Sequence, residues 1–255
     1  MPKPRLGVFK FSSCDGCQLS ILDAEEELLS LLDKVDLGDF LEASSASSGA
    51  PYDLALVEGS VSTQEEVDRI VKIRKDSKML VALGACATAG GLQALRNWSK
   101  LDLFESAVYP EPKVARGLEK ALPLSDFVAV DFELRGCPVS KAQLLQFFAT
   151  VLRGTKPRFP TSAVCFECKR GGTACLVVAD GTPCLGPVTA SGCGAICPSH
   201  GRGCYGCFGP SDDVNLDSFA SWLEAHSVDR STVTLLLKGA NSRSTEYRGW
   251  LEKNG

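Results

Sequence analysis

Twelve cysteines are the residues of this sequence whose type and number could do chemistry. The 255 residues contain only 2 His and 2 Met beside them. In a chain without secretory features, so many cysteines indicate metal binding or catalysis more than disulfides. Four thiolates complete one iron–sulfur cluster or one structural zinc site, so twelve cysteines suffice for three such sites.

Four of the cysteines are far apart in the sequence, and each follows a predicted strand. Cys14 and Cys17 follow residues 6–11, Cys86 follows residues 78–83, and Cys137 follows residues 126–132. Parallel strands end at one edge of a sheet, where open α/β proteins bind their ligands. We therefore expect these four thiols to form one site, at which neighbouring glycines let the backbone approach sulfur closely.

Simpler interpretations of this first set remain open. Cys14-Asp-Gly-Cys17 alone has the spacing of a thioredoxin-like redox pair, and a single buried cysteine is usually inert packing. The position of all four cysteines at strand ends favours a shared metal site over both. Glu58 follows the strand predicted at 53–57 at the same edge. It is either a group near the ligands or a subunit interface, or an ordinary strand-end carboxylate.

The other eight cysteines are close together in a segment rich in Gly and Pro. Their spacing is Cys165-x2-Cys168-x6-Cys175-x8-Cys184, then Cys193-x3-Cys197-x6-Cys204-x2-Cys207. The step Cys197-Pro198 resembles the Cys-Pro step of bacterial ferredoxins. Two structural zinc sites would also use four thiolates each. The nearby four-cysteine site at the sheet edge and the absence of a basic composition favour iron.

The elements that must position these cysteines fall into two kinds. Residues 5–153 alternate between short apolar strands and amphipathic helices, which predicts a parallel sheet covered on both faces. The strands are expected at 6–11, 53–57, 78–83 and 126–132, and the helices at 18–35, 64–75, 88–98 and 140–152. Thr63 and Glu66 have capping-box spacing at the start of the second helix. We predict a flavodoxin-like, doubly wound domain over residues 1–153.

The rest of the chain has a different character. Residues 154–210 show no sustained periodicity, and we expect an irregular iron–sulfur domain whose fold is stabilised by its metal. Residues 211–255 form a C-terminal tail, with a helix expected at 216–226 and a strand-like segment at 232–237.

The composition limits the classes of partner. Hydrophobic residues make up 44% and charged residues 23%, which are proportions of a globular protein. The net charge is −4, which argues against a nucleic-acid partner. No stretch approaches the ~20 apolar residues that span a bilayer, and residues 1–5 lack the apolar region of a secretory signal. We therefore expect a cytoplasmic protein without a membrane span.

The chain resembles the small, electron-transferring subunit of nickel–iron hydrogenases, most closely the cytosolic NAD(P)-coupled sulfhydrogenase type. Residues 5–210 carry the resemblance. The matching segments are Cys14-Asp-Gly-Cys17, Val57-Glu58-Gly59-Ser60, Gly84-Ala-Cys86-Ala-Thr-Ala-Gly-Gly91, Gly136-Cys137-Pro138, Pro183-Cys184-Leu-Gly-Pro-Val-Thr189 and Cys204-Tyr-Gly-Cys207-Phe-Gly-Pro210. Each motif is weak alone, but their ordered combination is specific.

This resemblance implies three [4Fe-4S] clusters. The proximal cluster would bind Cys14, Cys17, Cys86 and Cys137; the medial cluster Cys193, Cys197, Cys204 and Cys207; and the distal cluster Cys165, Cys168, Cys175 and Cys184. In better-known relatives a His stands at the position of Cys165, and a Pro often stands where Cys197 could be the fourth medial ligand. Both departures give this chain an all-cysteine set.

The resemblance also implies the reaction and the partners. The chain would belong to an oxidoreductase that acts on hydrogen, and would contribute no catalytic nucleophile or base. It would relay electrons between the nickel–iron centre of a large subunit and flavin and iron–sulfur diaphorase subunits that reduce NAD(P). Two alternatives remain: an electron-input subunit of a related respiratory complex, or a structural zinc protein that recruits partners.

Overall fold

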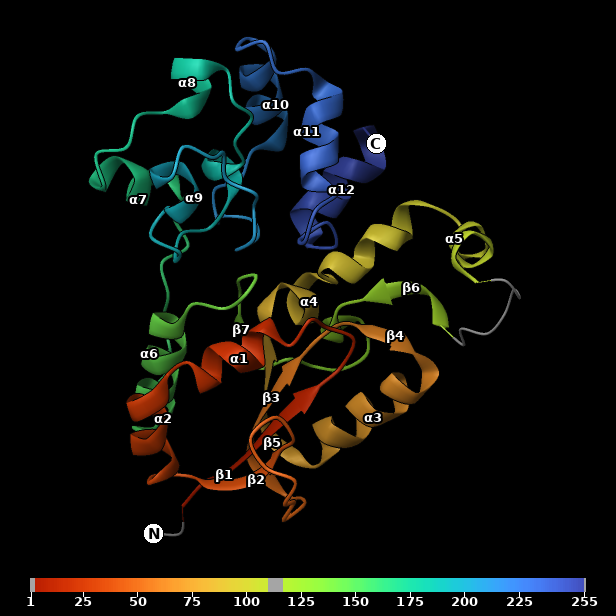
Figure 1. Cartoon of the computed structure of the whole chain (residues 1–255), viewed down its shortest axis with the longest axis vertical. Coiled ribbons are helices and arrows are strands. Elements are labelled where there is room, and N and C mark those ends of the chain that lie inside the picture. The colour runs from red at the N-terminus through yellow and green to blue at the C-terminus, as the bar shows by residue number, and fades with distance from the viewer. Residues whose placement is uncertain (1–2, 110–116, 255) are drawn as a thin grey trace.

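The N-terminal part is a parallel sheet with helices on both faces (Figure 1). The computed structural model describes residues 3–109 and 117–254; residues 1–2, 110–116 and 255, which the predicted domain ranges include, lie outside it. The sheet has five strands in the order β2-β1-β3-β5-β7, all paired in parallel. Their bounds are β1 Arg5–Lys10, β2 Asp36–Phe40, β3 Tyr52–Glu58, β5 Ser77–Leu83 and β7 Phe132–Leu134.

This strand order confirms the flavodoxin-like prediction. Counted along the sheet's own strands it is 2-1-3-4-5, the order of doubly wound flavodoxin-like proteins. Helices α1 (Gly16–Leu22), α2 (Glu25–Leu32) and α6 (Lys141–Val151) pack on one face, and α3 (Gln64–Lys75) packs on the other. Because both faces are covered, the central strands are apolar throughout rather than alternating.

Helix α3 begins where its capping box predicts. The Thr63 hydroxyl accepts a hydrogen bond from the Glu66 backbone N–H at 3.2 Å, and the Glu66 carboxylate accepts one from the Thr63 N–H at 3.2 Å. These bonds satisfy two N–H groups that a helix start otherwise leaves free, and such a cap stabilises by about 1 kcal/mol.

The single helix predicted over 18–35 is wrong, because the chain forms α1 and α2 with a break between them. Glu25 has a φ of +44°, and the Asp23 carbonyl accepts a hydrogen bond from Lys141 Nζ at 3.1 Å. The break lets leucines from both helices reach the same core. Strand β2, which follows, has no β-branched residue, so its local signal is weak.

The strand predicted over 126–132 is also wrong. The strand of this region, β7, forms only at Phe132–Leu134, and a 3-10 helix, η2 (Leu124–Asp126), lies at the predicted start. Phe127, Val128 and Val130 formed the apolar signal, and they pack against the core between the sheet and α3. The expected helix over 88–98 is split into α4 (Gly84–Ala89) and the 3-10 helix η1 (Leu92–Trp98), since Gly90 and Gly91 both have positive φ.

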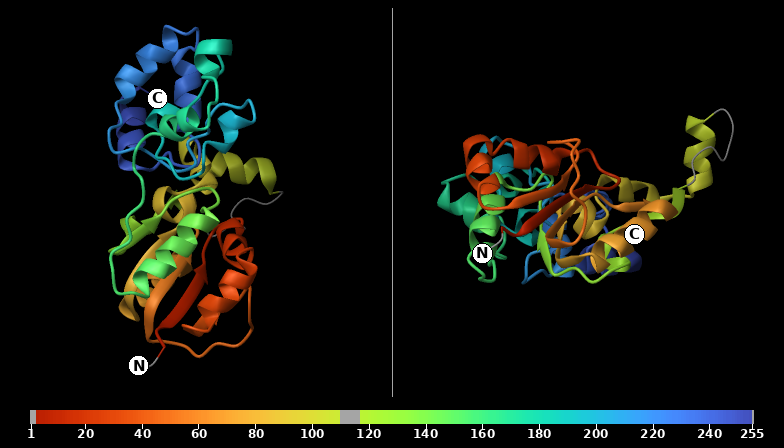
Figure 2. Two further views of the ribbon diagram at one scale, coloured as in Figure 1. Left: turned by 90° about the vertical axis from the view of Figure 1, so that its left-hand side faces the viewer. Right: turned by 90° about the horizontal axis from the view of Figure 1, so that it is seen from below.

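A smaller antiparallel pair and one projecting helix complete the N-terminal part. Strands β4 (Val61–Thr63) and β6 (Gly117–Leu122) pair with each other, and α5 (Leu101–Val108) extends from η1 away from the sheet (Figures 1 and 2). None of the described helices is both long and apolar enough to cross a bilayer.

The cysteine-rich segment contains only short helices. They are α7 (Cys165–Arg170), α8 (Leu176–Asp180), the 3-10 helix η3 (Gly186–Val188) and α9 (Ile196–Ser199). Three longer helices follow: α10 (Leu216–Glu224), α11 (Arg230–Leu237) and α12 (Thr245–Asn254). Val177, Leu185 and Val188 share one apolar core with these last helices. The cysteine-rich segment therefore has an apolar core of its own, which the C-terminal residues largely provide.

The strand-like segment expected at 232–237 is a helix, α11. The Asp229 carboxylate caps it by accepting a hydrogen bond from the Thr232 N–H at 2.9 Å. Val233 and Leu237 are four residues apart and both buried, which is helical spacing that the run of β-branched and leucine residues obscures.

Candidate metal centres

The first set of cysteines lies together at the edge of the sheet where the strands end. Cys14 and Cys17 flank the start of α1, Cys86 lies in α4 directly after β5, and Cys137 follows β7. Burial and then the charge of Cys137 raise the pKa of Cys86 to about 12, and Cys14 adds to this rise. Burial also raises the pKa of Cys17, with Cys86 and Cys137 among the smaller causes. Thiols from three distant parts of the sequence therefore act on one another.

Glycines give these thiols their close approach. Gly84 has a φ of +82°, and a Cβ at this position would lie 2.3 Å from Cys17 Sγ. The Ala85 N–H donates to the Gly136 carbonyl at 2.8 Å, which joins the loop of Cys86 to the loop of Cys137. Only a residue without a side chain fits at Gly84 while Cys17 keeps its position.

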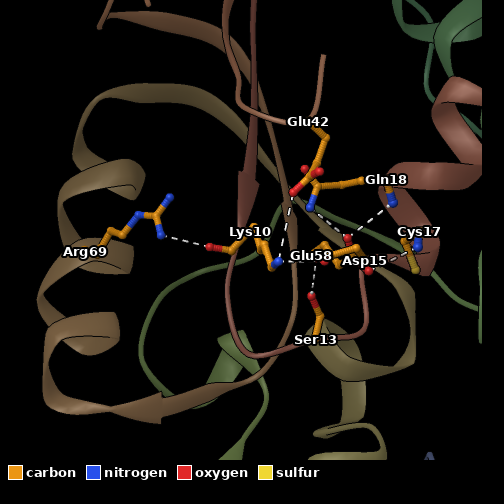
Figure 3. A network of polar contacts seen from close by, with 8 residues as sticks. All are labelled: Lys10, Ser13, Asp15, Cys17, Gln18, Glu42, Glu58 and Arg69. Atoms are coloured by element: carbon orange, nitrogen blue, oxygen red, sulfur yellow. Dashed lines mark hydrogen bonds and ion pairs between the residues drawn. The ribbon is translucent and has the colours of Figure 1, made fainter. Parts of the chain in front are cut away.

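Glu58 holds the start of α1 at this edge (Figure 3). Its carboxylate is 1% exposed and accepts hydrogen bonds from the Cys17 N–H at 3.0 Å, the Gln18 N–H at 3.2 Å and the Gln18 side-chain amide at 3.0 Å. The side chain is thus buried against the first cysteine set rather than available at a surface. Lys10, the last residue of β1, forms an ion pair with Asp15 at 2.6 Å just before α1.

The second set surrounds a cavity in the cysteine-rich segment. Cys165, Cys168, Cys175 and Cys184 all line this cavity of about 500 Å³. Phe219 and Trp222 of α10 line another side of it, so its wall is partly aromatic. Burial and then the charge of Cys184 raise the pKa of Cys165 to about 11. The four thiols therefore line one open and largely apolar cavity.

The third set lies between the other two. Burial and then the charge of Cys193 raise the pKa of Cys207 to about 12, and Cys197 adds to the effect. Burial raises the pKa of Cys204 to about 12, although the Gly206 N–H donates to this sulfur at 3.4 Å. Cys197 lies in the first turn of α9. These relations bring Cys193, Cys197, Cys204 and Cys207 into one neighbourhood.

The three sets touch in a row. The charge of Cys137 is among the causes that raise the pKa of Cys207, which places the first set beside the third. The Cys204 N–H donates to Cys184 Sγ at 3.1 Å, which connects the third set to the second. The first and second sets are therefore joined through the third, from the sheet edge into the cysteine-rich segment.

The donors fit iron–sulfur clusters. All twelve side chains are free thiols, and thiolate-only sets are typical of iron–sulfur clusters or zinc. Within residues 3–109 and 117–254, no three His, Cys, Asp or Glu side chains converge closely enough to hold a single ion. Burial and mutual repulsion raise the pKa of several thiols, and a positively charged metal group reverses that effect by favouring thiolates.

Glu167 is a further residue of these centres that the sequence patterns do not indicate. It lies between Cys165 and Cys168, and its carboxylate accepts hydrogen bonds from the Gly192 N–H at 2.9 Å and the Ala195 N–H at 3.2 Å. A carboxylate within a Cys-x2-Cys motif is the only signal that could have marked it. His200 directly follows α9 and is exposed, and its Nδ1 lies 2.9 Å from the carbonyl of Ile196 at the start of that helix.

Comparisons with known proteins agree with this geometry. The family model described as NADH ubiquinone oxidoreductase, 20 kDa subunit, matches residues 14–151. The chain is 41% identical to the sulfhydrogenase 2 subunit delta of Pyrococcus furiosus, over 83% of this chain and 89% of that protein. It is 31% identical to a chain of the F420-non-reducing hydrogenase vhu of Methanocaldococcus jannaschii, over 82% of each chain. The crystal structure of an NAD+-reducing [NiFe]-hydrogenase contains a chain that superposes with a TM-score of 0.58 at 30% identity, covering 62% of this chain and 96% of that one.

Proposed function

Because this chain belongs to the small subunits of nickel–iron hydrogenases, within the family of the NADH ubiquinone oxidoreductase 20 kDa subunit, we propose that it relays electrons through three [4Fe-4S] clusters. The relay would connect the nickel–iron centre of a large subunit with subunits that reduce NAD(P). The observation that carries the proposal is the row of neighbouring cysteines from Cys137 through Cys207 and Cys204 to Cys184.

The ligand sets follow the three neighbourhoods. We assign the first set to the proximal cluster, the third to the medial cluster and the second to the distal cluster. When bound, the clusters supply one-electron transfer. The chain's own residues bury part of these thiols and donate backbone N–H groups to sulfur, as those of Gly206 and Cys204 do.

The partners and the compartment are proposed from the relatives. A multi-subunit NAD+-reducing hydrogenase includes a chain of this fold, which supports flavin and iron–sulfur diaphorase subunits as partners here. The assembled complex would be cytoplasmic.

Metal analysis tests this proposal directly. The chain in its anaerobically purified complex should contain about twelve iron atoms and twelve sulfides beyond those of the partner subunits, four of each per cluster. Iron, acid-labile sulfide and zinc are measured on the same sample. About four irons with zinc making up the remainder would limit the chain to a proximal cluster, and zinc alone would exclude the electron relay.

This chain exposes an apolar surface on which the large subunit can dock. The segment from η1 to the residue after α5 exposes large apolar side chains, namely Leu92, Leu95, Trp98, Leu103, Phe104, Val108 and Tyr109. This surface starts beside the proximal set, because the Cys86 thiol donates to Gln93 Oε1 at 3.2 Å. A chain that covers the surface therefore lies next to Cys86, as the subunit with the nickel–iron centre must.

A charge on this surface should weaken assembly. Leu103 is 61% exposed, so Leu103→Glu leaves the fold intact but places a carboxylate in the interface. We expect about tenfold less large subunit to co-purify, which corresponds to about 1.4 kcal/mol. Leu235→Glu is the matched control, because Leu235 is 70% exposed on α11. Equal recovery of the large subunit with both variants would show that α5 lies outside the interface.

A further inference from the structure

Glu167 touches two of the proposed ligand sets at once. Its backbone belongs to α7, between Cys165 and Cys168 of the distal set. Its carboxylate reaches the loop of the medial set, where Gly192 and Ala195 flank Cys193. One oxygen accepts the Gly192 N–H at 2.9 Å, and the other accepts the Ala195 N–H at 3.2 Å. A single side chain thus holds both ends of the Cys193 turn.

The Cys193 turn needs such support because its backbone is unusual. Ala195 is 2% exposed and has a φ of +53°, a left-handed conformation that non-glycine residues rarely adopt. On the other side, Gly192 lies against α6, where an added Cβ would be 2.3 Å from the Gln143 amide nitrogen. The turn is therefore fixed between Glu167 and Gln143, with Cys193 projecting from it.

A second contact aligns the same two segments. Ala163 and Ala190 form an isolated antiparallel bridge, and the Ser191 N–H donates to the Ser162 carbonyl at 2.8 Å. These bonds bring the chain before α7 beside the chain that leads to Gly192. They stop short of Cys193, so beyond Ser191 the Glu167 carboxylate continues the connection.

We infer that Glu167 is a positioning residue that fixes the Cys193 turn to the distal ligand helix and lowers the reduction potential of the medial cluster. This inference rests on the ligand assignment proposed above. The Gly192 N–H bonds to Glu167 rather than turning toward the cluster sulfurs, and N–H bonds to sulfur favour the reduced cluster. Its negative charge acts in the same direction. Residues 154–210 contain only one other acidic residue, Asp180, which is exposed.

Glu167→Gln separates these effects from simple stability. The amide has nearly the same volume but only one acceptor oxygen, so one of the two N–H groups loses its partner. In the purified complex we expect the iron content to be unchanged and the medial cluster to be reduced at a higher potential. The proximal signal in electron paramagnetic resonance should stay where it is in the wild type, because Glu167 contacts no residue of that set.

Controls decide between a positioning role and a general charge effect. Asp180→Asn removes the same charge from the same segment, and it should leave the medial potential unchanged. The inference would be overturned if the medial reduction potential shifted equally in both variants, or if it did not shift in Glu167→Gln. So would a loss of iron from all three sets, since this would make Glu167 necessary for the whole fold. If the wild-type complex itself contained zinc in these sets, the proposed function would fail instead.

Discussion

A Gly84→Ala substitution should remove the proximal cluster and, with it, hydrogen-dependent activity. The new Cβ would lie 2.3 Å from Cys17 Sγ, so the thiol has to leave the position from which it faces Cys86 and Cys137. We expect about four of twelve irons to be lost, as for one cluster. Activity with an artificial acceptor should fall by at least about 100-fold, since a displacement of about 1 Å at a reaction centre already has such an effect.

The control for this prediction is Gly154→Ala. Gly154 has a φ of +71°, close to the +82° of Gly84, but a Cβ there meets no atom within 4 Å. Both alanines carry the conformational cost of a positive φ, of about 1 kcal/mol, and only Gly84→Ala also displaces a thiol. Full iron content in Gly84→Ala would show that Cys17 does not ligate from this position.

Much of this fold could be predicted because its signals are local. β5 contains the continuous apolar run 79–83, and α3 begins at a capping box. The observed bounds of both elements therefore agree with the predicted bounds to within one residue. β2 and α11 could not be predicted in the same way. β2 is defined by pairing with β1, and α11 by the helices packed around it, so tertiary contacts outweigh their local preferences.

The sites divide in the same manner. The convergence of Cys14, Cys86 and Cys137 follows from parallel topology, because every parallel strand delivers its C-terminal end to the same edge. The strand before Cys137 was predicted at the wrong residues, but the expected convergence still holds, because β7 ends three residues before this cysteine. Glu167 is different. Its role depends on a loop more than twenty residues away, and no periodicity connects the two.

Replacing Cys197 should change the number of iron atoms in the medial cluster. It lies in the first turn of α9, where backbone N–H groups have no partner within the helix, so a proline ring is tolerated there. Cys197→Pro removes one thiolate and leaves one iron without a protein ligand. That iron should be lost, which leaves a three-iron cluster with an altered potential, because cluster type and net charge set the potential.

Electron paramagnetic resonance of the oxidised complex detects this change. A three-iron cluster gives a signal when oxidised, whereas an oxidised low-potential four-iron cluster does not. Cys197→Ala should give the same signal without a proline ring, which separates loss of the thiol from a change in the backbone. The fold should survive in both variants, because Val177, Leu185 and Val188 still pack against the C-terminal helices. An unchanged spectrum with undiminished iron would mean that Cys197 is not a ligand, and the medial set would then need a different fourth donor.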